Sequence, residues 1–155
     1  MGVRLAKRGC VIAASLAFTL VLGACGPPPP SSPAADDLVA RHAALRSERG
    51  LPVETRDQYA TDNAQFHADR LAARATNCSS LWHSPELGSW YTGRWAAENV
   101  ACVTGCPADA AVPFWLWAHS PGHFANLVNP SYGVIGVGVS CSGSVQMFVA
   151  QYASP

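Results

Sequence analysis

The sequence predicts an α+β domain in which helices come first and a β-hairpin comes last. Two observations lead to this fold class. The first half of the domain has helical hydrophobic periodicity with helix start and stop signals, and its end has two runs rich in valine around a short turn. Because helices and strands are segregated along the chain, we expect a small antiparallel sheet that is covered by helices.

The residues before the predicted domain carry an export signal. A basic start, in which Arg4, Lys7 and Arg8 supply the charges, precedes an apolar run from Val11 to Leu22. This run is shorter than the roughly twenty helical residues that span a bilayer. It fits the apolar region of a secretory signal peptide instead, and we predict a signal peptide over residues 1–24.

The end of this signal resembles a bacterial lipobox, the leucine-to-cysteine motif of lipoproteins, in the residues Leu22-Gly23-Ala24-Cys25. The resemblance implies cleavage before Cys25 and attachment of lipid to that cysteine. The stretch that follows is rich in proline and serine, which predicts an extended tether over residues 25–35 and a folded domain over residues 36–155. The expected location is outside the cytoplasm, anchored by lipid to the cell membrane. A plain secreted protein, in which Cys25 is incidental, is the alternative.

The charge of the chain argues against a nucleic-acid partner. Three of the ten basic residues lie in the predicted signal, so residues 25–155 keep seven arginines, no lysine and ten acidic residues, a formal charge of −3. Nucleic-acid binding requires a basic patch. We expect a monomer that binds no nucleic acid.

Four cysteines remain in the domain once Cys10 and Cys25 are set aside. They are Cys78, Cys102, Cys106 and Cys141. An even number of cysteines in an exported domain predicts two disulfides, with three possible pairings. A cysteine-rich metal site is the alternative, but the chain has no C-x-x-C pair.

Two helices are predicted at the start of the domain. Asp36 and Asp37 precede apolar residues and Gly50-Leu51-Pro52 supplies a stop, which predicts a short helix between them. Thr55 is a suitable N-cap for a longer helix that runs to about Ala75. The residues on the apolar half of this second helix are Tyr59, Phe66, His67 and Leu71.

The middle of the domain contains one predicted strand and one predicted helix. Residues 77–94 are rich in turn-forming residues. Asn99–Val103 predicts a short buried strand. The apolar stretch Ala108–Trp117 predicts a helix that Pro113 either starts or kinks.

A hairpin is predicted at the end of the chain. The runs Tyr132–Ser140 and Val145–Tyr152 flank Ser142-Gly143, which favours a short turn. Gly136 and Gly138 lie inside the first run. A glycine within a strand indicates a close approach of another backbone, so these glycines do not predict a nucleotide-binding loop.

Two histidines, His119 and His123, stand four residues apart in the segment WAHSPGHFANLVNP. On one unbroken helix this spacing would place both imidazoles on one face, as in zinc-binding helices. Ser120 is a good N-cap, however, and Pro121 suits the first position of a helix. We therefore predict that a new helix begins here, that His119 ends the previous one, and that the two histidines share no face. The partial positive charge of a helix N-terminus favours a neutral imidazole at His123, the form that binds metal or acts as a base.

A set of short motifs occurs along the chain in a fixed order. They are Gly50-Leu51-Pro52, His83-Ser84, Glu98-Asn99-Val100, Trp117-x-x-Ser120-Pro121-Gly122-His123-x-x-Asn126-Leu127 and Gly136-Val137-Gly138. On this ordered set the chain resembles the CAP superfamily (cysteine-rich secretory proteins, antigen 5 and pathogenesis-related 1), in its compact bacterial SCP-like form. The resemblance covers about Leu38 to Tyr152 and implies an α-β-α sandwich, with a small antiparallel sheet between helical layers and a cleft.

The resemblance also implies a set of cleft residues. Two histidines of the family face the cleft and hold a divalent ion, often zinc, and they match His83 and His123. A cleft glutamate matches Glu98, and a second glutamate of many members is replaced here by Ser120. The implied binding cleft is therefore His83, Glu98, Ser120 and His123, with the two histidines as metal ligands and Glu98 as the one catalytic candidate.

The cysteine pairing is implied by the resemblance as well. Cys78 and Cys141 match a bridged pair of the plant members, which leaves Cys102 to pair with Cys106.

The function that we predict is a non-enzymatic binding module of the cell envelope. Zinc takes four ligands, or three and a water in catalytic sites, whereas the implied cleft is incomplete and the chain shows no nucleophile–base pair. The candidate ligands are a lipid, a glycan or a cell-wall component. The sequence requires no cofactor, and zinc or another divalent cation is the candidate. A metal-dependent, peptidase-like hydrolase that uses His83, His123 and Glu98 is the first alternative. Capture of a lipid or sterol between helices is the second.

Overall fold

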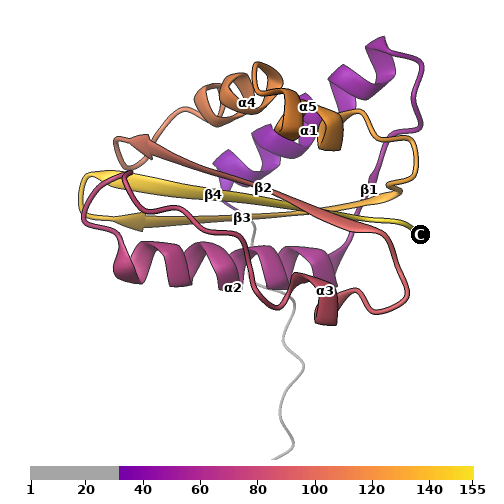
Figure 1. Ribbon diagram of the computed structural model, residues 1–155. Coiled ribbons are helices and arrows are strands. Elements are labelled where there is room, and N and C mark those ends of the chain that lie inside the picture. Colours follow the sequence, from indigo (N-terminus) through magenta and orange to yellow (C-terminus); the bar gives the residue numbers. More distant parts are fainter. Residues whose placement is uncertain (1–31) are drawn as a thin grey trace, which may run out of the picture.

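A four-stranded sheet forms the middle layer of the fold (Figure 1). Its strands are β1 (Thr55–Arg56), β2 (Ala96–Thr104), β3 (Val134–Ser142) and β4 (Val145–Ala153), and their order across the sheet is β1-β3-β4-β2. The predicted hairpin is confirmed as β3 and β4. The sheet is mixed rather than purely antiparallel, because β1 pairs parallel with β3. A strand of two residues is too short to show a period in the sequence.

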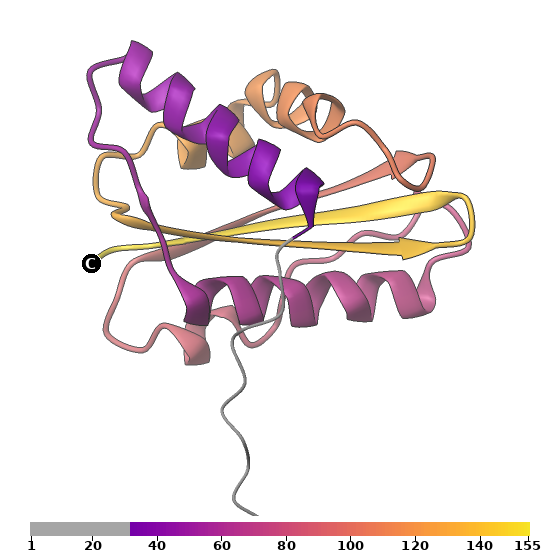
Figure 2. The same cartoon turned by 180° about the vertical axis from the view of Figure 1, so that it is seen from behind.

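Helices cover both faces of this sheet, which confirms the predicted α+β class and the α-β-α sandwich (Figures 1 and 2). On one face lie α2 (Gln58–Arg74) and the short α3 (Leu87–Trp90). On the other face lie α1 (Pro33–Glu48), α4 (Ala111–Ala118) and α5 (Pro121–Leu127). We call these the α2 layer and the α1 layer. The strand order leaves β2 at one edge of the sheet.

The computed structural model describes residues 32–155. The predicted signal peptide (1–24), the predicted lipidation site Cys25 and residues 26–31 of the predicted tether lie outside the described residues. The boundary of that tether at residue 35 is wrong, since α1 begins at Pro33 and the Ser32 side chain caps it by accepting from the Ala35 amide (3.1 Å). Proline suits the first turn of a helix, where its missing N–H is not needed. Within residues 32–155, no helix has the length and hydropathy needed to cross a membrane.

Helix α2 lies almost against the backbone of the sheet. A Cβ atom added at Gly136 of β3 would overlap the backbone of Ala60, and one added at Gly138 would overlap that of Ala64. The close approach predicted from these glycines is confirmed. Alanine side chains make up much of the buried side of the helix, which lets the two backbones approach.

The apolar half predicted for α2 is only partly buried. His67 and Leu71 lie in the interior, whereas Tyr59 and Phe66 are 51% and 53% exposed. The helix also begins later than predicted, because Asp57 rather than Thr55 is the N-cap. The Asp57 carboxylate accepts from the Ala60 amide (2.8 Å).

The break predicted between the two histidines is confirmed. His119 is the C-cap of α4, Ser120 is the N-cap of α5, and Pro121 is the first residue of α5. Pro113 lies in the first turn of α4, where a proline is tolerated.

The cysteine pairing implied by the family resemblance is wrong. The disulfides join Cys78 to Cys102 and Cys106 to Cys141, instead of Cys78 to Cys141 and Cys102 to Cys106. The alternation of side chains along a strand explains this result. Cys102 packs with Val100 against the α2 layer, whereas Cys141 has the strand parity of Val139, which packs against the α1 layer.

Each of the other two cysteines reaches the sheet from one layer. Cys78 follows the end of α2, and Cys106 lies in the loop that leads to α4. That loop is held to the end of the hairpin, since the amides of Gly105 and Ala108 donate to Ser144 and Gln146. A bridge from Cys78 to Cys141 would join residues on opposite faces of the sheet.

A buried polar network lies beneath α1. Arg46 is fully buried and donates to the backbone carbonyls of four residues: Pro52, Leu127, Asn129 and Tyr132. It also forms an ion pair with Glu54 (3.1 Å). Burial raises the pKa of Glu54 to about 7, although the charge of Arg46 opposes that shift.

His42 is the second titratable group in this network. Its Nδ1–H donates to the Leu38 carbonyl (2.7 Å), and its Nε2 accepts from the Tyr152 hydroxyl (2.7 Å). Burial lowers the pKa of His42 to about 4. The hydrogen bond to Leu38 raises this pKa, whereas the charge of Arg46 lowers it further. The imidazole is therefore neutral at neutral pH.

We expect His42 to weaken the fold on acidification. Because the folded pKa of about 4 lies below the unfolded value of about 6.5, the unfolded chain binds more protons in this window, and stability falls as pH drops. The loss reaches about 3 kcal/mol by pH 4. Glu54 has the opposite sign, since its raised pKa makes the folded state bind more protons between about pH 4.5 and 7. Urea unfolding of the wild type and of His42→Gln at pH 7 and pH 4 isolates the histidine. The advantage of the wild type over the variant should shrink by about 3 kcal/mol, and an unchanged difference contradicts a neutral buried His42.

Candidate functional site

The candidate site lies at the edge strand β2, where two consecutive residues point to opposite faces of the sheet. Because side chains alternate along a strand, Glu98 faces the α2 layer and Asn99 faces the α1 layer. The segment that carries His83 is bonded to Glu98. Helix α5, which carries His123, is bonded to Asn99.

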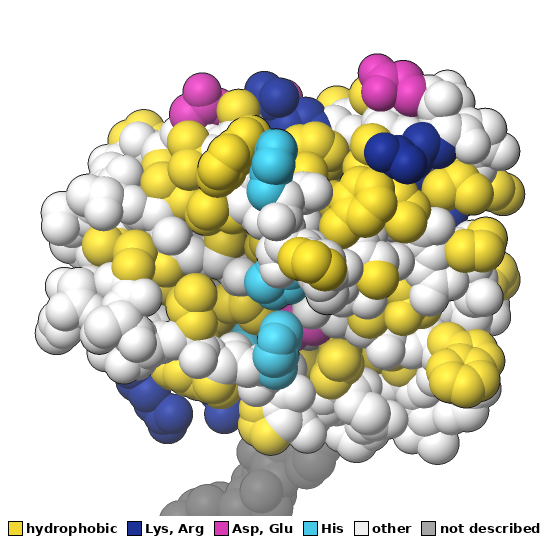
Figure 3. All heavy atoms as spheres, turned by 45° about the horizontal axis from the view of Figure 1, so that its top comes forward, with side chains coloured by type: hydrophobic (Ala, Val, Ile, Leu, Met, Phe, Trp, Pro, Cys, Tyr) yellow, Lys and Arg dark blue, Asp and Glu magenta, His cyan; other side chains and the backbone are white. Residues whose placement is uncertain are grey.

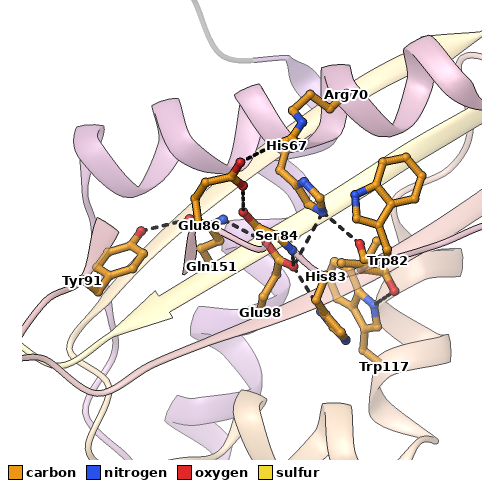
Figure 4. Close-up of polar contacts among 11 residues, drawn as sticks. His67, Arg70, Trp82, His83, Ser84, Glu86, Tyr91, Glu98, Trp117 and Gln151 are labelled. Carbon is orange, nitrogen blue, oxygen red and sulfur yellow. Dashed lines mark hydrogen bonds and ion pairs between the residues drawn. The ribbon is translucent and has the colours of Figure 1, made fainter. Parts of the chain in front are cut away.

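Glu98 is buried, and both of its carboxylate oxygens accept hydrogen bonds (Figure 4). Oε1 accepts from the Ser84 amide (2.9 Å) and from Nδ1 of His83 (3.1 Å), and Oε2 accepts from the Gln151 side chain (2.9 Å). The Tyr91 hydroxyl donates to Gln151 in turn (3.1 Å). Since the side chain of Glu98 is 1% exposed, its oxygens are directed at protein donors rather than at the solvent side of the site.

His83 presents one nitrogen to solvent. Its side chain is 62% exposed, and its Nδ1–H donates to Glu98. Nε2 then carries the lone pair and has no partner within the described chain. A histidine that donates one ring N–H to a carboxylate is oriented for metal binding through the other nitrogen. Glu98 therefore orients the His83 ring and does not itself reach the solvent side of the site.

The segment around His83 is held by bonds on both sides. The Ser84 hydroxyl donates to Glu86 (3.0 Å), and Arg70 of α2 donates to the same carboxylate (2.7 Å). The Arg70 hydrogen bond holds the pKa of Glu86 below its usual value, although Glu86 is exposed. Upstream, the Cys78–Cys102 disulfide ties the segment to β2.

His67 lies next to Glu98 and is not among the predicted cleft residues. It is fully buried, its Nε2–H donates to the Trp82 carbonyl (2.9 Å), and Nε2 lies 3.8 Å from Oε1 of Glu98 (Figure 4). Nδ1 of His67 has no hydrogen-bond partner in residues 32–155. Its signal in the sequence is the position of a histidine on the apolar half of an amphipathic helix, a pattern that indicates packing against the core.

His123 enters the site from the α1 layer. The Asn99 side chain donates to the backbone carbonyl of His123 (3.1 Å) and accepts from the Asn126 amide (2.8 Å). Burial lowers the pKa of His123, and the charge of a protonated His83 lowers it further. Both effects favour the neutral imidazole at His123, the form that can bind a metal.

Ser120, the remaining predicted cleft residue, and its neighbour His119 contribute less to the site. Ser120 is half-buried at the start of α5, and its side chain makes no cap hydrogen bond. His119 is exposed, bonds to the Trp115 carbonyl (2.8 Å) and stacks on the Trp115 ring with the centroids 4.3 Å apart. His119 is therefore engaged with α4 and not with the cleft.

Figure 3 shows histidine side chains in a row on one face of the molecule, with part of an acidic side chain beside the lower two. The described histidines that are not buried are His83, His119 and His123. Residues 32–155 contain no group of three or more His, Cys, Asp or Glu side chains that could hold a metal. The imidazoles of His83 and His123 would be two of the four ligands that a zinc ion takes, so water or a bound ligand would have to supply the others.

Comparisons with known proteins agree with this architecture. The family model of the cysteine-rich secretory protein family, CAP, matches residues 39–152. The chain belongs to the CAP family. No curated protein sequence matches it.

The fold is that of solved CAP proteins. An outer surface protein from Borrelia burgdorferi is similar with a TM-score of 0.65 and 18% identity, over 78% of this chain and 92% of that one. An extracellular SCP-domain protein from Bacillus anthracis is similar with a TM-score of 0.61 and 21% identity, over 81% of this chain and 45% of that one. NaASP2, solved with Zn²⁺, is similar with a TM-score of 0.62 and 15% identity, over 81% of this chain and 82% of that one. The chain thus spans less than half of the Bacillus protein, and these identities establish the fold alone.

Proposed function

We propose that this protein is an exported, lipid-anchored binding module that holds a divalent metal ion of the zinc type between His83 and His123. The main support for this proposal is the orientation of His83, whose Nδ1–H is fixed by the buried Glu98 while its Nε2 is free. The backbone of His123 is fixed through Asn99, and burial together with the charge of His83 lowers the pKa of His123. Export is supported by the surface and extracellular relatives named above and by the leader-like sequence, and the anchor is supported by the lipobox at Cys25.

A hydrolase has less support from the same geometry. A water-activating carboxylate must reach the water, but Glu98 is buried and its oxygens accept from Ser84, His83 and Gln151. The Ser84 hydroxyl donates to Glu86 rather than to an imidazole, so it is not activated as a nucleophile. A metal held by two imidazoles is more consistent with binding, in which the ligand completes the coordination.

Zinc titration of untagged protein tests this proposal. We expect His83→Ala and His123→Ala each to weaken Zn²⁺ binding at least tenfold, about 1.4 kcal/mol, because each removes one of two imidazole ligands. Affinity should also fall on acidification, since a protonated imidazole does not bind metal.

The control is His119→Ala, which removes an accessible histidine that stacks on Trp115 instead of facing the cleft. It should leave the zinc affinity unchanged. If His119→Ala weakens binding as much as the other two, or if the wild type binds no zinc, the proposed metal site is wrong. Hydrolysis of a cell-wall or peptide substrate that stops in His83→Ala would restore the enzyme alternative.

A further inference from the structure

Helix α4 is apolar on all sides, although the protein covers only one of them. Its sequence is AVPFWLWA, without a charged residue. Pro113 and Trp117 face the interior, whereas Val112, Trp115 and Leu116 are 41%, 57% and 41% exposed. A helix that is apolar all round is normally covered all round. The exposed side of α4 therefore lacks an apolar partner within the described chain.

This exposed side is also hollowed. An open hollow of about 310 Å³ is lined by Ala111, Val112 and Trp115. Figure 3 shows hydrophobic side chains gathered on the same face as the row of histidines. We call Val112, Trp115 and Leu116 the α4 ridge.

The described part of the chain begins in the α1 layer, which also contains α4. Ala34 and Ala35, in the first turn of α1, pack in the same apolar cluster as Ala110 and Phe114 at the start of α4. Only seven residue steps separate Ser32 from Cys25, and a chain of that length spans at most about 25 Å. A lipid on Cys25 would therefore keep the bilayer within about 25 Å of the start of α1.

The chemistry of the ridge matches the interface of a bilayer. Tryptophan is enriched at the level of the lipid headgroups, where its ring is apolar and its N–H remains hydrated. No charge on α4 would have to be desolvated. Eight residues form a helix of about 12 Å, too short to span a bilayer, so this helix would lie in the plane of the interface.

We propose that the α4 ridge docks on the surface of the membrane to which the protein is anchored, with Trp115 at headgroup depth. This inference rests on the lipid anchor of the proposed function and goes beyond it, because an anchor alone leaves the domain free to turn. Docking of α4 orients the domain. It also places the histidine cleft beside the membrane, since α5 follows α4 after two residues.

Quenching by brominated lipid tests the proposal. The lipidated full-length product is reconstituted in vesicles of phosphatidylcholine and phosphatidylglycerol, with bromine on the upper part of the acyl chains. We expect Trp115→Ser to lower the quenched part of the tryptophan emission at least twofold. The matched control is Trp95→Ser, which removes a tryptophan that is 77% exposed but precedes β2, away from α4. This control should keep the quenching of the wild type.

Several outcomes would overturn the docking. Equal quenching in Trp115→Ser and Trp95→Ser would contradict the docking. A dimer that forms with rising protein concentration and covers Trp115 would contradict it as well. The double variant Val112→Ser with Leu116→Ser provides a second measurement. It keeps Trp115 but makes the α4 ridge less apolar, so the quenching of Trp115 should decrease. Circular dichroism shows whether each variant is folded, and mass spectrometry shows whether Cys25 carries lipid. An unlipidated Cys25 contradicts the anchor in the proposed function, whereas a lipidated protein with an unquenched Trp115 contradicts only the docking of α4.

Discussion

Gly136→Ala is expected to destabilise the domain by about 3 kcal/mol or more. The added methyl group would overlap the backbone of Ala60 and Thr61 in α2. A clash with a side chain can be relieved by a change of rotamer, but a clash with helical backbone requires α2 to move away from the sheet. The same helix carries His67 and Arg70, which support the segment around His83. We therefore expect zinc binding to weaken along with stability.

Urea unfolding measures this effect, and Gly88→Ala is its control. Gly88 lies in α3, and a Cβ atom built there has no neighbour within 4 Å. An alanine in a helix with free space is neutral or stabilises by up to about 1 kcal/mol. A loss below about 1 kcal/mol for Gly136→Ala would mean that α2 does not lie directly on β3.

Removal of the Cys78–Cys102 disulfide is expected to weaken zinc binding at least tenfold. This bridge ties the segment that leads to His83 onto β2, four residues along the strand from Glu98. Between the end of α2 and His83 the chain has no helix or strand of its own. The hydrogen bonds of Trp82 and Ser84 would remain, but they would have to order a segment whose other end is released.

The Cys106–Cys141 disulfide provides a matched control. The two bridges close loops with sequence separations of 24 and 35 residues, so the loop-entropy model assigns each a stabilisation of about 3 to 4 kcal/mol. Paired alanine variants should therefore lose similar stability, while only the Cys78/Cys102 variant loses metal affinity. Both are measured at a temperature at which circular dichroism shows them to be folded. Equal zinc affinity in the two variants would show that the bridge does not position His83.

The sequence predicts the layers of this fold well, because its signals are local. Valine runs around Gly143 predict the hairpin, and a proline after a serine predicts where α5 begins. Gly136 and Gly138 predict the close contact with α2. Strand β1 was missed, since two residues carry no period and its pairing with β3 depends on distant residues.

The candidate site is predicted only in part from the sequence, and the parts that are missed depend on contacts between distant residues. His83 and His123 were implied by the family motifs, but the role of Glu98 depends on donors from Ser84 and Gln151 that no local pattern links. The disulfides were transferred from relatives, although strand parity places Cys102 and Cys141 on opposite faces. Strand parity alone excludes only a Cys102–Cys141 bridge. The choice between the other two pairings depends on which layer Cys78 and Cys106 reach, and that is set by the tertiary fold.

The neighbouring positions of Glu98 and Asn99 fix the two helical layers to one point of the edge strand. Glu98 is bonded to the segment from the α2 layer, and Asn99 is bonded to the backbone of the helix from the α1 layer, so both layers are fixed to a single peptide unit of the sheet. A change of sequence in either layer leaves that unit untouched. The side chains on either side of this unit can therefore be changed one residue at a time, on a frame that does not have to be rebuilt with them.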